Sequence, residues 1–120
     1  MLLNDFFRII ELDASADTLV STIRLNPEHS IFSGHFPNNP VTPGVVQLQI
    51  VKEILEDIHK KELHLETIAQ CRFLKILNPE TTPVIIVKIN SSITDNLITV
   101  KASGAENENV FFKFNAVYSI

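Results

Sequence analysis

The chain has 120 residues, is 45% hydrophobic and carries a formal net charge of −4 at pH 7. This length is typical of one domain, and no Gly/Ser-rich or charged linker divides the sequence, so we predict a single domain over residues 1–120. The acidic balance argues against a general surface for nucleic acid or for anionic membranes.

Neither a membrane span nor a signal peptide is predicted. No apolar run approaches the roughly 18 residues that a membrane-spanning helix requires. The apolar start of the chain is interrupted by Asp5 and Arg8, unlike the continuous apolar region of a secretory signal. The single cysteine, Cys71, excludes an intrachain disulfide and a cysteine metal cluster, and we expect it to be a small buried residue. These features indicate a cytoplasmic protein.

The elements are predicted in chain order from the periodicity of apolar residues. Residues 4–13 indicate a short turn or helical start that leads into an apolar stretch, and residues 18–25 alternate as a strand does. After a loop over residues 26–44, residues 45–58 carry apolar side chains at three- and four-residue spacings, which predicts a helix buried over most of its circumference. Strands rich in Ile, Val, Thr and Phe, joined by polar turns, are predicted over residues 65–76, 84–92, 97–103 and 110–118. The pattern is α+β, with an antiparallel sheet wrapped around one central helix.

The loop before this helix contains most of the functional information. Residues 34–44 read Gly-His-Phe-Pro-Asn-Asn-Pro-Val-Thr-Pro-Gly, and the three prolines fix φ and favour extended neighbours, so the loop is stiff. It presents His35 just before the helix, which makes this histidine the first candidate for chemistry. Pro43 and Gly44 suit the first helical turn, where backbone N–H groups lack intrahelical partners and can bind a polar ligand atom.

These motifs resemble those of the 3-hydroxyacyl-[acyl-carrier-protein] dehydratase family, the FabZ/FabA-like enzymes of the hotdog fold. The similar segments are Gly34-His35-Phe36-Pro37, Pro40, Pro43-Gly44-Val45 and Arg72-Phe73-Leu74-Lys75. The resemblance extends to the order of elements over essentially the whole chain. It implies a hotdog fold, in which an antiparallel sheet wraps one long central helix, and a dimer whose active site is built from both subunits.

The resemblance also implies roles for residues around the helix start. Dehydration needs a base for the α-proton, donors for the developing enolate oxygen and an acid for the departing hydroxyl. His35 matches the family's catalytic histidine, and the N–H of Gly44, or of its neighbour Val45, is expected to hold the thioester carbonyl. Phe36, Pro43 and Val45 are counted among the substrate-binding residues, although the aromatic side chain of Phe36 also suits the core.

The expected acid is missing. The family has Glu or Asp on the helix 14 positions after the histidine, and here that position is Gln49. A carboxamide cannot deliver a proton, and a general acid or base typically contributes about 10²- to 10⁴-fold. Glu53 lies on the same helix face, but one turn away, about 5.4 Å, so it would reach substrate only after a rearrangement or through a water. Two interpretations of Gln49 stay open: it positions substrate, or it is tolerated in a site that is no longer catalytic.

The leading prediction is a hydro-lyase that converts 3-hydroxyacyl thioesters on acyl carrier protein to trans-2-enoyl thioesters, in fatty-acid or related acyl biosynthesis. The alternative is a catalytically impaired acyl-thioester-binding subunit that pairs with an active dehydratase paralogue. A hotdog thioesterase has less weight, because position 49 lacks a carboxylate to activate water. No cofactor or metal is expected, since His29, His59 and His64 lack a ligand-type spacing.

The predicted partners follow from the same resemblance. Arg72 and Lys75 are candidates for attracting the acidic carrier protein, with Arg8 and Lys113 as additions. A homodimer or a heterodimer with a paralogue is expected, with higher assembly open, and neither nucleic acid nor membrane is predicted as a partner.

Overall fold

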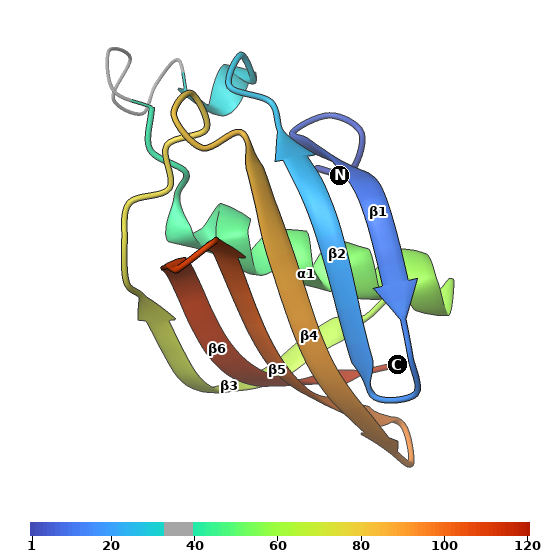
Figure 1. The fold of residues 1–120 in the computed structure, drawn as a ribbon. Helices are drawn as coiled ribbons and strands as arrows, with labels where there is room; N and C mark the ends of the chain where they lie inside the picture. Colours follow the sequence, from blue (N-terminus) through green and yellow to red (C-terminus); the bar gives the residue numbers. More distant parts are fainter. Residues whose placement is uncertain (33–39) are drawn as a thin grey trace.

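The computed structural model describes residues 1–32 and 40–120. Within these residues the chain forms an antiparallel sheet, one α-helix and a short 3₁₀ helix (Figure 1). The elements in chain order are β1 (Phe7–Ala14), β2 (Thr18–Leu25), η1 (Ser30–Phe32), α1 (Gly44–His59), β3 (His64–Phe73), β4 (Val84–Thr94), β5 (Leu97–Glu106) and β6 (Asn109–Ser119).

The described strands form one six-stranded sheet in the order β1-β2-β4-β5-β6-β3, with every neighbouring pair antiparallel. The β4–β5 and β5–β6 pairs are hairpins whose turns contain Asp95 and Asn107 at positive φ, 58° and 53°. Asp and Asn adopt this left-handed conformation at lower cost than most residues. The polar turns predicted from the sequence are therefore confirmed.

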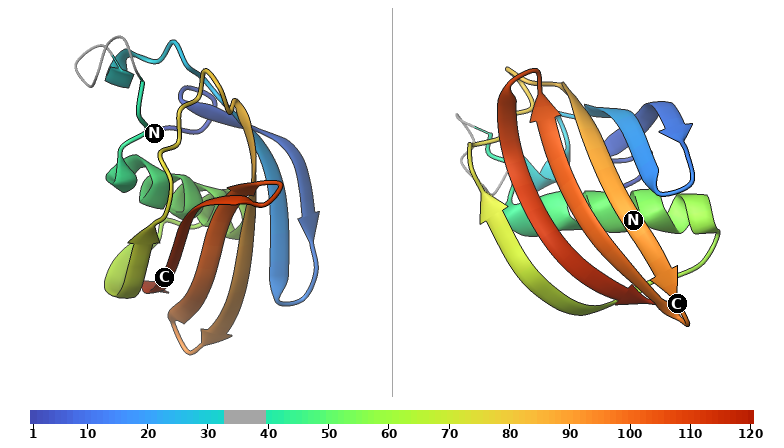
Figure 2. Two further views of the ribbon diagram at one scale, coloured as in Figure 1. Left: turned by 60° about the vertical axis from the view of Figure 1, so that its left-hand side comes forward. Right: turned by 60° about the horizontal axis from the view of Figure 1, so that its bottom comes forward.

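The predicted α-helix is confirmed, since α1 begins and ends within one residue of the expected bounds. It has 16 residues and lies across the concave face of the sheet, which curves around it (Figure 2). Within α1, seven residues are buried, eight are half-buried and Val45 is exposed. No helix in the described part of the chain is long and apolar enough to cross a membrane.

The sequence predicted a short turn or helical start over residues 4–13, and the turn is found at residues 4–6, where Asp5 N and Phe6 N donate to Leu2 O. The apolar stretch that follows is the strand β1, which pairs with β2 and has a bulge between Ile9 and Glu11.

One predicted bound was wrong. The strand predicted over 65–76 ends at Phe73. The chain then leaves the sheet toward the helix start, where Leu77 O accepts a hydrogen bond from Thr42 N at 2.9 Å.

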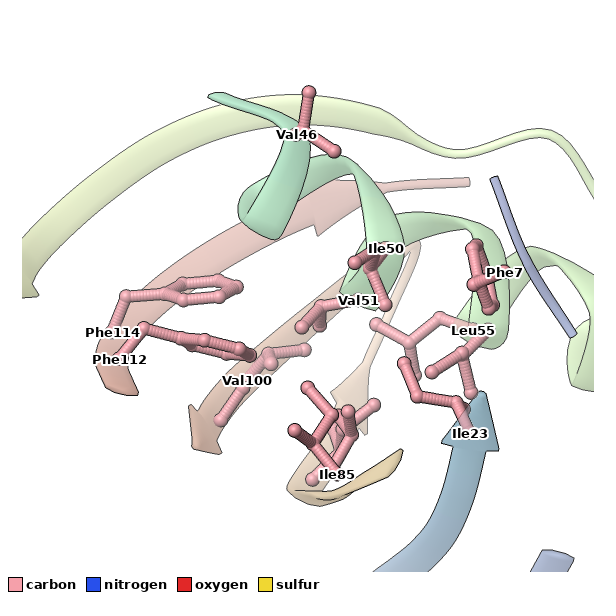
Figure 3. Packing of buried hydrophobic residues seen from close by; sticks show 14 of the residues in the cluster. Phe7, Ile23, Val46, Ile50, Val51, Leu55, Ile85, Val100, Phe112 and Phe114 are labelled. Atoms are coloured by element: carbon pink, nitrogen blue, oxygen red, sulfur yellow. The ribbon is translucent and has the colours of Figure 1, made fainter. Parts of the chain in front are cut away.

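The hydrophobic core lies between α1 and the concave face of the sheet. Ile50, Val51 and Leu55 of the helix lie over inward-facing side chains of the strands, such as Ile23 and Val100 (Figure 3). The Phe112 and Phe114 rings stack with their centroids 6.1 Å apart at one end of this layer. The helix is thus fixed by packing along its length, so its first turn is held in a defined place relative to the sheet.

Candidate functional site

The first turn of α1 has backbone donors that no described residue pairs with. Pro43 occupies the N-cap with φ −59° and ψ 148°, and no side chain caps the helix. The N–H groups of Gly44 and Val45 have no hydrogen-bond partner among the described residues. Unpaired N–H groups at a helix N-terminus favour a negatively charged or carbonyl oxygen, because the helix dipole adds to their partial charge. The geometry therefore suits a ligand oxygen.

The Phe73 ring lies so close to position 44 that it leaves no room for a side chain there. A Cβ added at Gly44 would lie 2.7 Å from Cε2 and Cζ of Phe73, so the Phe73 ring packs directly against the first turn. The segment before the helix is fixed from the other side, where Gln47 Nε2 donates to Thr42 O at 3.0 Å. Gln47 Oε1 and Thr42 Oγ1 are buried without a partner among the described residues.

A hollow of about 430 Å³ lies beside the first turn. It is lined by residues 41–44, by Gln47 and by residues 73–77. Exposed apolar side chains are among its lining residues, since Phe73 is 48% exposed and Ile76 68% exposed. The sequence placed Pro43, Gly44 and Val45 together at the substrate site, and the structure brings these three to one helix start; their contact with substrate stays a prediction.

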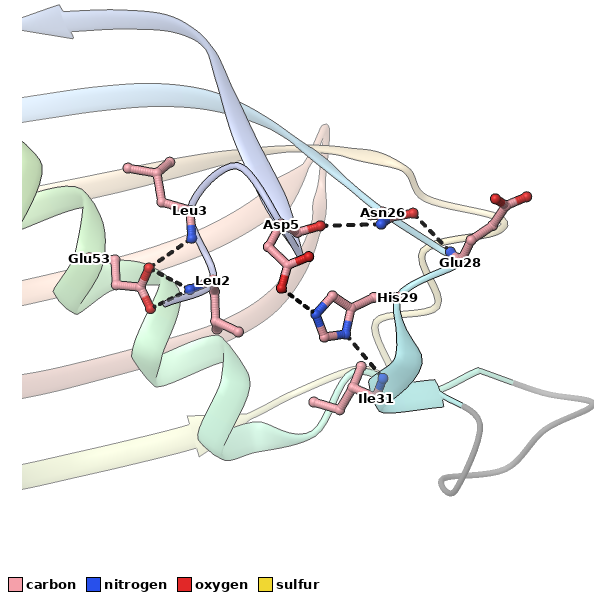
Figure 4. A network of polar contacts seen from close by, with 8 residues as sticks. All are labelled: Leu2, Leu3, Asp5, Asn26, Glu28, His29, Ile31 and Glu53. Atoms are coloured by element: carbon pink, nitrogen blue, oxygen red, sulfur yellow. Dashed lines mark hydrogen bonds and ion pairs between the residues drawn. The ribbon is translucent and has the colours of Figure 1, made fainter.

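Glu53 is held by the N-terminal segment. Its side chain is only 1% exposed, and its Oε1 accepts hydrogen bonds from Leu2 N and Leu3 N, both at 2.8 Å (Figure 4). Oε2 accepts from Leu2 N at 3.0 Å and from Gln49 Nε2 at 2.9 Å. Three donors therefore share this carboxylate, and the N–H of Leu2 is divided between its two oxygens. Glu53 therefore has a structural partner, and its expected contact with substrate stays a prediction.

The same network sets the orientation of Gln49. A carboxylate without a proton can only accept, so the Gln49 side chain must direct its Nε2 toward Glu53. Gln49 Oε1 is left over, and it accepts no hydrogen bond from the described residues. Position 49 thus offers an acceptor, where an acid would offer a proton.

His35 and Phe36 lie in residues 33–39, outside the described residues. Their predicted roles stay predictions. His29, by contrast, has a clear structural role: its Nε2 contacts Asp5 Oδ2 at 3.0 Å and its Nδ1 accepts from Ile31 N at 3.0 Å (Figure 4). Among the described residues, no group of three His, Cys, Asp or Glu side chains is placed to hold a metal ion.

The two predicted carrier-contact residues differ in their surroundings. Arg72 is exposed on the outer face of β3, opposite Lys113 of β6. Lys75 lies beyond the strand and donates to Asn109 Oδ1 at 2.6 Å. Sequence reasoning missed Lys88 and Lys101, which lie on the same outer face. The sequence shows that both lysines alternate with apolar neighbours, but it does not show which strands lie side by side.

Cys71 is exposed, so the prediction that it is buried was wrong. The reason is its strand: β3 is at the edge of the sheet, and each of its ten residues is exposed. Several of them are large and apolar, namely Leu65, Ile68 and Phe73. An exposed apolar edge strand is a typical site of pairing with another chain.

Comparison with known proteins gives consistent matches. Residues 11–113 match the family described as ApeI-like, ApeI dehydratase. A 3-hydroxyacyl-[acyl-carrier-protein] dehydratase FabZ of Caldanaerobacter subterraneus subsp. tengcongensis is 28% identical over 110 residues, covering 86% of this chain and 77% of the relative. The FabZ of Thermoanaerobacter sp. strain X514 is 30% identical over 91 residues, covering 70% of this chain and 63% of the relative.

Among solved structures, the dehydratase heterocomplex ApeI:P from Xenorhabdus doucetiae matches with a TM-score of 0.73 and 21% identity. The match covers 93% of this chain and 96% of the ApeI:P chain. At this identity the likeness establishes the fold alone, and with the antiparallel sheet and its single α-helix it identifies a hotdog fold.

Proposed function

Since this chain belongs to the ApeI-like dehydratase family, we propose that it dehydrates 3-hydroxyacyl thioesters on acyl carrier protein to trans-2-enoyl thioesters. The observation that carries the proposal is the first turn of α1. Two N–H groups there have no partner among the described residues, and the Phe73 ring packs against Gly44 beside them. A thioester carbonyl bound at these donors would gain most as negative charge develops on its oxygen, which lowers the barrier to removing the α-proton.

In the proposed reaction, His35 takes the proton from C2 of the substrate, and the carbonyl oxygen becomes an enolate held by the N–H groups of Gly44 and Val45. The enolate then re-forms the carbonyl as the C2–C3 double bond forms and the C3–O bond breaks. Gln49 Oε1 accepts a hydrogen bond from the 3-hydroxyl and positions it. The imidazolium of His35 returns its proton to the departing hydroxyl, which leaves as water. No cofactor is consumed in these steps.

We propose that the β3 edge pairs with a second chain, either another copy or a paralogue. The apolar side chains of Leu65, Ile68 and Phe73 are exposed along this edge, and pairing would extend the sheet and cover them. Ile68→Lys places a charge in the proposed interface and should shift sedimentation equilibrium toward the monomer. An unchanged association constant would contradict this interface.

The second candidate function is an impaired subunit of a heterodimer. It is favoured by the Gln49–Glu53 contact, because Gln49 carries no acid proton and Glu53 is held by two backbone N–H groups of the N-terminal segment. The resemblance implies that the acid comes from the other subunit. A paralogue with a carboxylate at that position would therefore complete a site with this chain's His35, whereas a homodimer would contain only Gln49.

The deciding experiment assays purified protein with a 3-hydroxyacyl thioester on acyl carrier protein, following the absorbance of the enoyl product. Wild type, Gln49→Glu and His35→Ala are compared. Activity in wild type that is lost in His35→Ala supports the dehydratase. If only Gln49→Glu turns over, or if wild type gains activity on mixing with a dehydratase paralogue, the impaired-subunit alternative holds. Release of free thiol without enoyl product would instead indicate a thioesterase.

A further inference from the structure

His29 contacts two separate parts of the chain through its two ring nitrogens. Its Nδ1 accepts a hydrogen bond from Ile31 N at 3.0 Å, within the same turn, and its Nε2 contacts Asp5 Oδ2 at 3.0 Å (Figure 4). Asp5 lies 24 residues earlier in the chain. We call these two contacts the His29 link. The link joins the N-terminal segment to η1, which contains Ile31.

The backbone donor fixes the place of the proton on the ring. A backbone N–H only donates, so Nδ1 of His29 must be unprotonated to accept from Ile31 N. In the neutral ring the proton is then on Nε2, which donates it to the Asp5 carboxylate. A second proton, on Nδ1, would point at the Ile31 N–H and abolish that hydrogen bond. The His29 link is therefore complete only while the ring is neutral.

The local half of the link does not require histidine. Asn26 and Asn78 each accept from the backbone N–H two residues further on, at 3.0 and 2.9 Å, which is the usual turn formed by asparagine. An asparagine at position 29 can make the same contact with Ile31 N. Only the second ring nitrogen of a histidine reaches Asp5, so the distant half of the link accounts for the residue type.

The surroundings hold the ring in place. The side chain of His29 is 13% exposed, and its ring meets the Phe6 ring edge to face, with centroids 5.5 Å apart. Phe6 is fully buried and also contacts the Phe32 ring, at 5.7 Å. Asp5 is the only acidic side chain among the described residues that pairs with His29, and the neighbouring Glu28 is exposed. Asp5 therefore favours a charged ring, whereas the backbone donor favours a neutral one.

The His29 link fixes the point from which the segment with the proposed base departs. Phe32 N donates to His29 O at 3.1 Å, and η1 ends at Phe32, three residues before His35. Three residues span at most about 11 Å, so the place of Phe32 bounds where His35 can lie. A displacement of a reacting group by about 1 Å can cost about 100-fold in rate.

The N-terminal segment also connects the link with Gln49. Leu2 N and Leu3 N donate to Glu53, which accepts from Gln49 as well. Asp5 follows closely in the same turn, where its N–H donates to Leu2 O at 3.0 Å. One short segment thus contacts the Gln49 network on one side and, through the His29 link, η1 on the other.

We propose that His29 is a positioning residue for the dehydration proposed above, on which this inference rests: its neutral ring ties η1 to the N-terminal segment and so fixes the entry to the segment that carries His35. His29 itself contacts no reacting atom. Protonation of its ring releases η1 and lowers the rate. Because Asp5 is 67% exposed, the link should contribute little to the stability of the whole fold.

The first test separates positioning from folding. His29→Ala removes both halves of the link, and His29→Asn keeps an acceptor for Ile31 N but cannot reach Asp5. With a 3-hydroxyacyl pantetheine thioester as substrate, we expect His29→Ala to lower kcat about tenfold with KM within about twofold of wild type, and His29→Asn to recover part of the loss. His59→Ala, in the last turn of α1, is the matched control and should stay near wild type. Urea denaturation measures the stability of every variant.

The pH dependence gives a readout that a merely structural role would not move. In wild type both His29 and His35 must be neutral, so the acid side of the kcat/KM profile should be steeper than in His29→Asn. Asp5→Asn keeps an acceptor for the Nε2 proton but removes the charge that favours the protonated ring. Its activity should therefore extend to lower pH than that of wild type.

Amide exchange of Ile31, followed by NMR over the same pH range, tests the link without substrate. Its protection factor should fall on the acid side in wild type and persist to lower pH in Asp5→Asn. If this is seen but wild type turns over no 3-hydroxyacyl thioester, the proposed function fails and the positioning role with it, while the link itself stands. Protection that does not change with pH, an equal loss of kcat in His59→Ala, or a loss of kcat that follows a loss of stability overturns the proposal.

Discussion

The first turn of α1 and the turns that follow it use their polar groups in opposite ways. At the first turn, the N–H groups of Gly44 and Val45 have no partner among the described residues, and the Val45 side chain is exposed. Further along, the buried carboxylate is paired: Glu53 accepts from Leu2, Leu3 and Gln49. One helix therefore has an open end that suits a ligand and a closed middle that supports the fold.

This difference explains how a carboxamide at position 49 is compatible with the fold. Gln49 keeps a hydrogen bond to Glu53 that a second carboxylate could make only by sharing a proton. The helix start needs no side-chain chemistry, because its donors belong to the backbone. The carbonyl-binding part of the proposed site is therefore insensitive to the change at position 49.

The largest effect is expected at the closed middle. Glu53→Ala leaves the N–H groups of Leu2 and Leu3 and the Gln49 amide without their acceptor, which should lower the free energy of unfolding by about 3 kcal/mol. Urea denaturation measures this loss. Asp57→Ala on the same helix is the control, because its contact with Lys60 at 3.7 Å is exposed and should contribute less than about 1 kcal/mol. Equal losses in both variants would remove the distinction between buried and exposed carboxylates.

The next effect tests position 49 itself. Gln49→Glu places a second carboxyl beside Glu53, where the two like charges raise the pKa of one of them and keep it protonated near neutral pH. If a missing acid limits the rate, kcat should rise about 100-fold and the gain should fall as pH increases and that carboxyl ionises. Gln49→Ala is the comparison: a fall in kcat would show that the native carboxamide positions substrate. No gain in Gln49→Glu at any pH would contradict a limiting acid.

A smaller effect is expected at the open end. Gly44→Ala brings a methyl group within 2.7 Å of the Phe73 ring, so either the ring or the first turn must move. Phe73 is half-exposed and can yield, so stability should change little, but a shift of the N–H donors should lower kcat/KM about tenfold. Gly44→Ala/Phe73→Leu relieves the clash and should recover most of the activity. Failure of this rescue would mean that glycine matters for another reason.

Features that depend on a segment's own residues could be predicted from the sequence, whereas features that depend on contacts between distant segments could not. Alternation and polar turns located β2 and the β4–β6 meander, and apolar spacing located α1, because these patterns arise from each segment's own contacts with the core. The bulge in β1 disguised that strand. Glu53 is held by backbone donors about 50 residues away, and backbone N–H groups leave no trace in the sequence. The gathering of Arg72, Lys88, Lys101 and Lys113 on one face of the sheet depended on strand order, which alternation within a strand cannot reveal.

The smallest effect concerns the far end of α1, where the pairing continues as Glu56 accepts from Leu63 N at 2.9 Å. Burial, and then the negative charge of Glu56, raise the pKa of Tyr118 from 10.0 to about 12. The folded protein thus holds a phenol proton that the unfolded chain releases above pH 10, so this stabilisation is complete below pH 10 and is lost as pH rises toward 12. By pH 11 the loss should be about 1 kcal/mol.

Tyr118→Phe removes this titration. Urea denaturation of both proteins at pH 8, 10 and 11 should therefore show a steeper alkaline loss in wild type than in the variant. A parallel decline would assign the alkaline sensitivity to other groups. A smaller alkaline loss of stability in Tyr118→Phe than in wild type would show that the last turn of α1 also belongs to the closed part of the helix. The reason is that burial, with the charge of Glu56, is what keeps the phenol of Tyr118 protonated above pH 10.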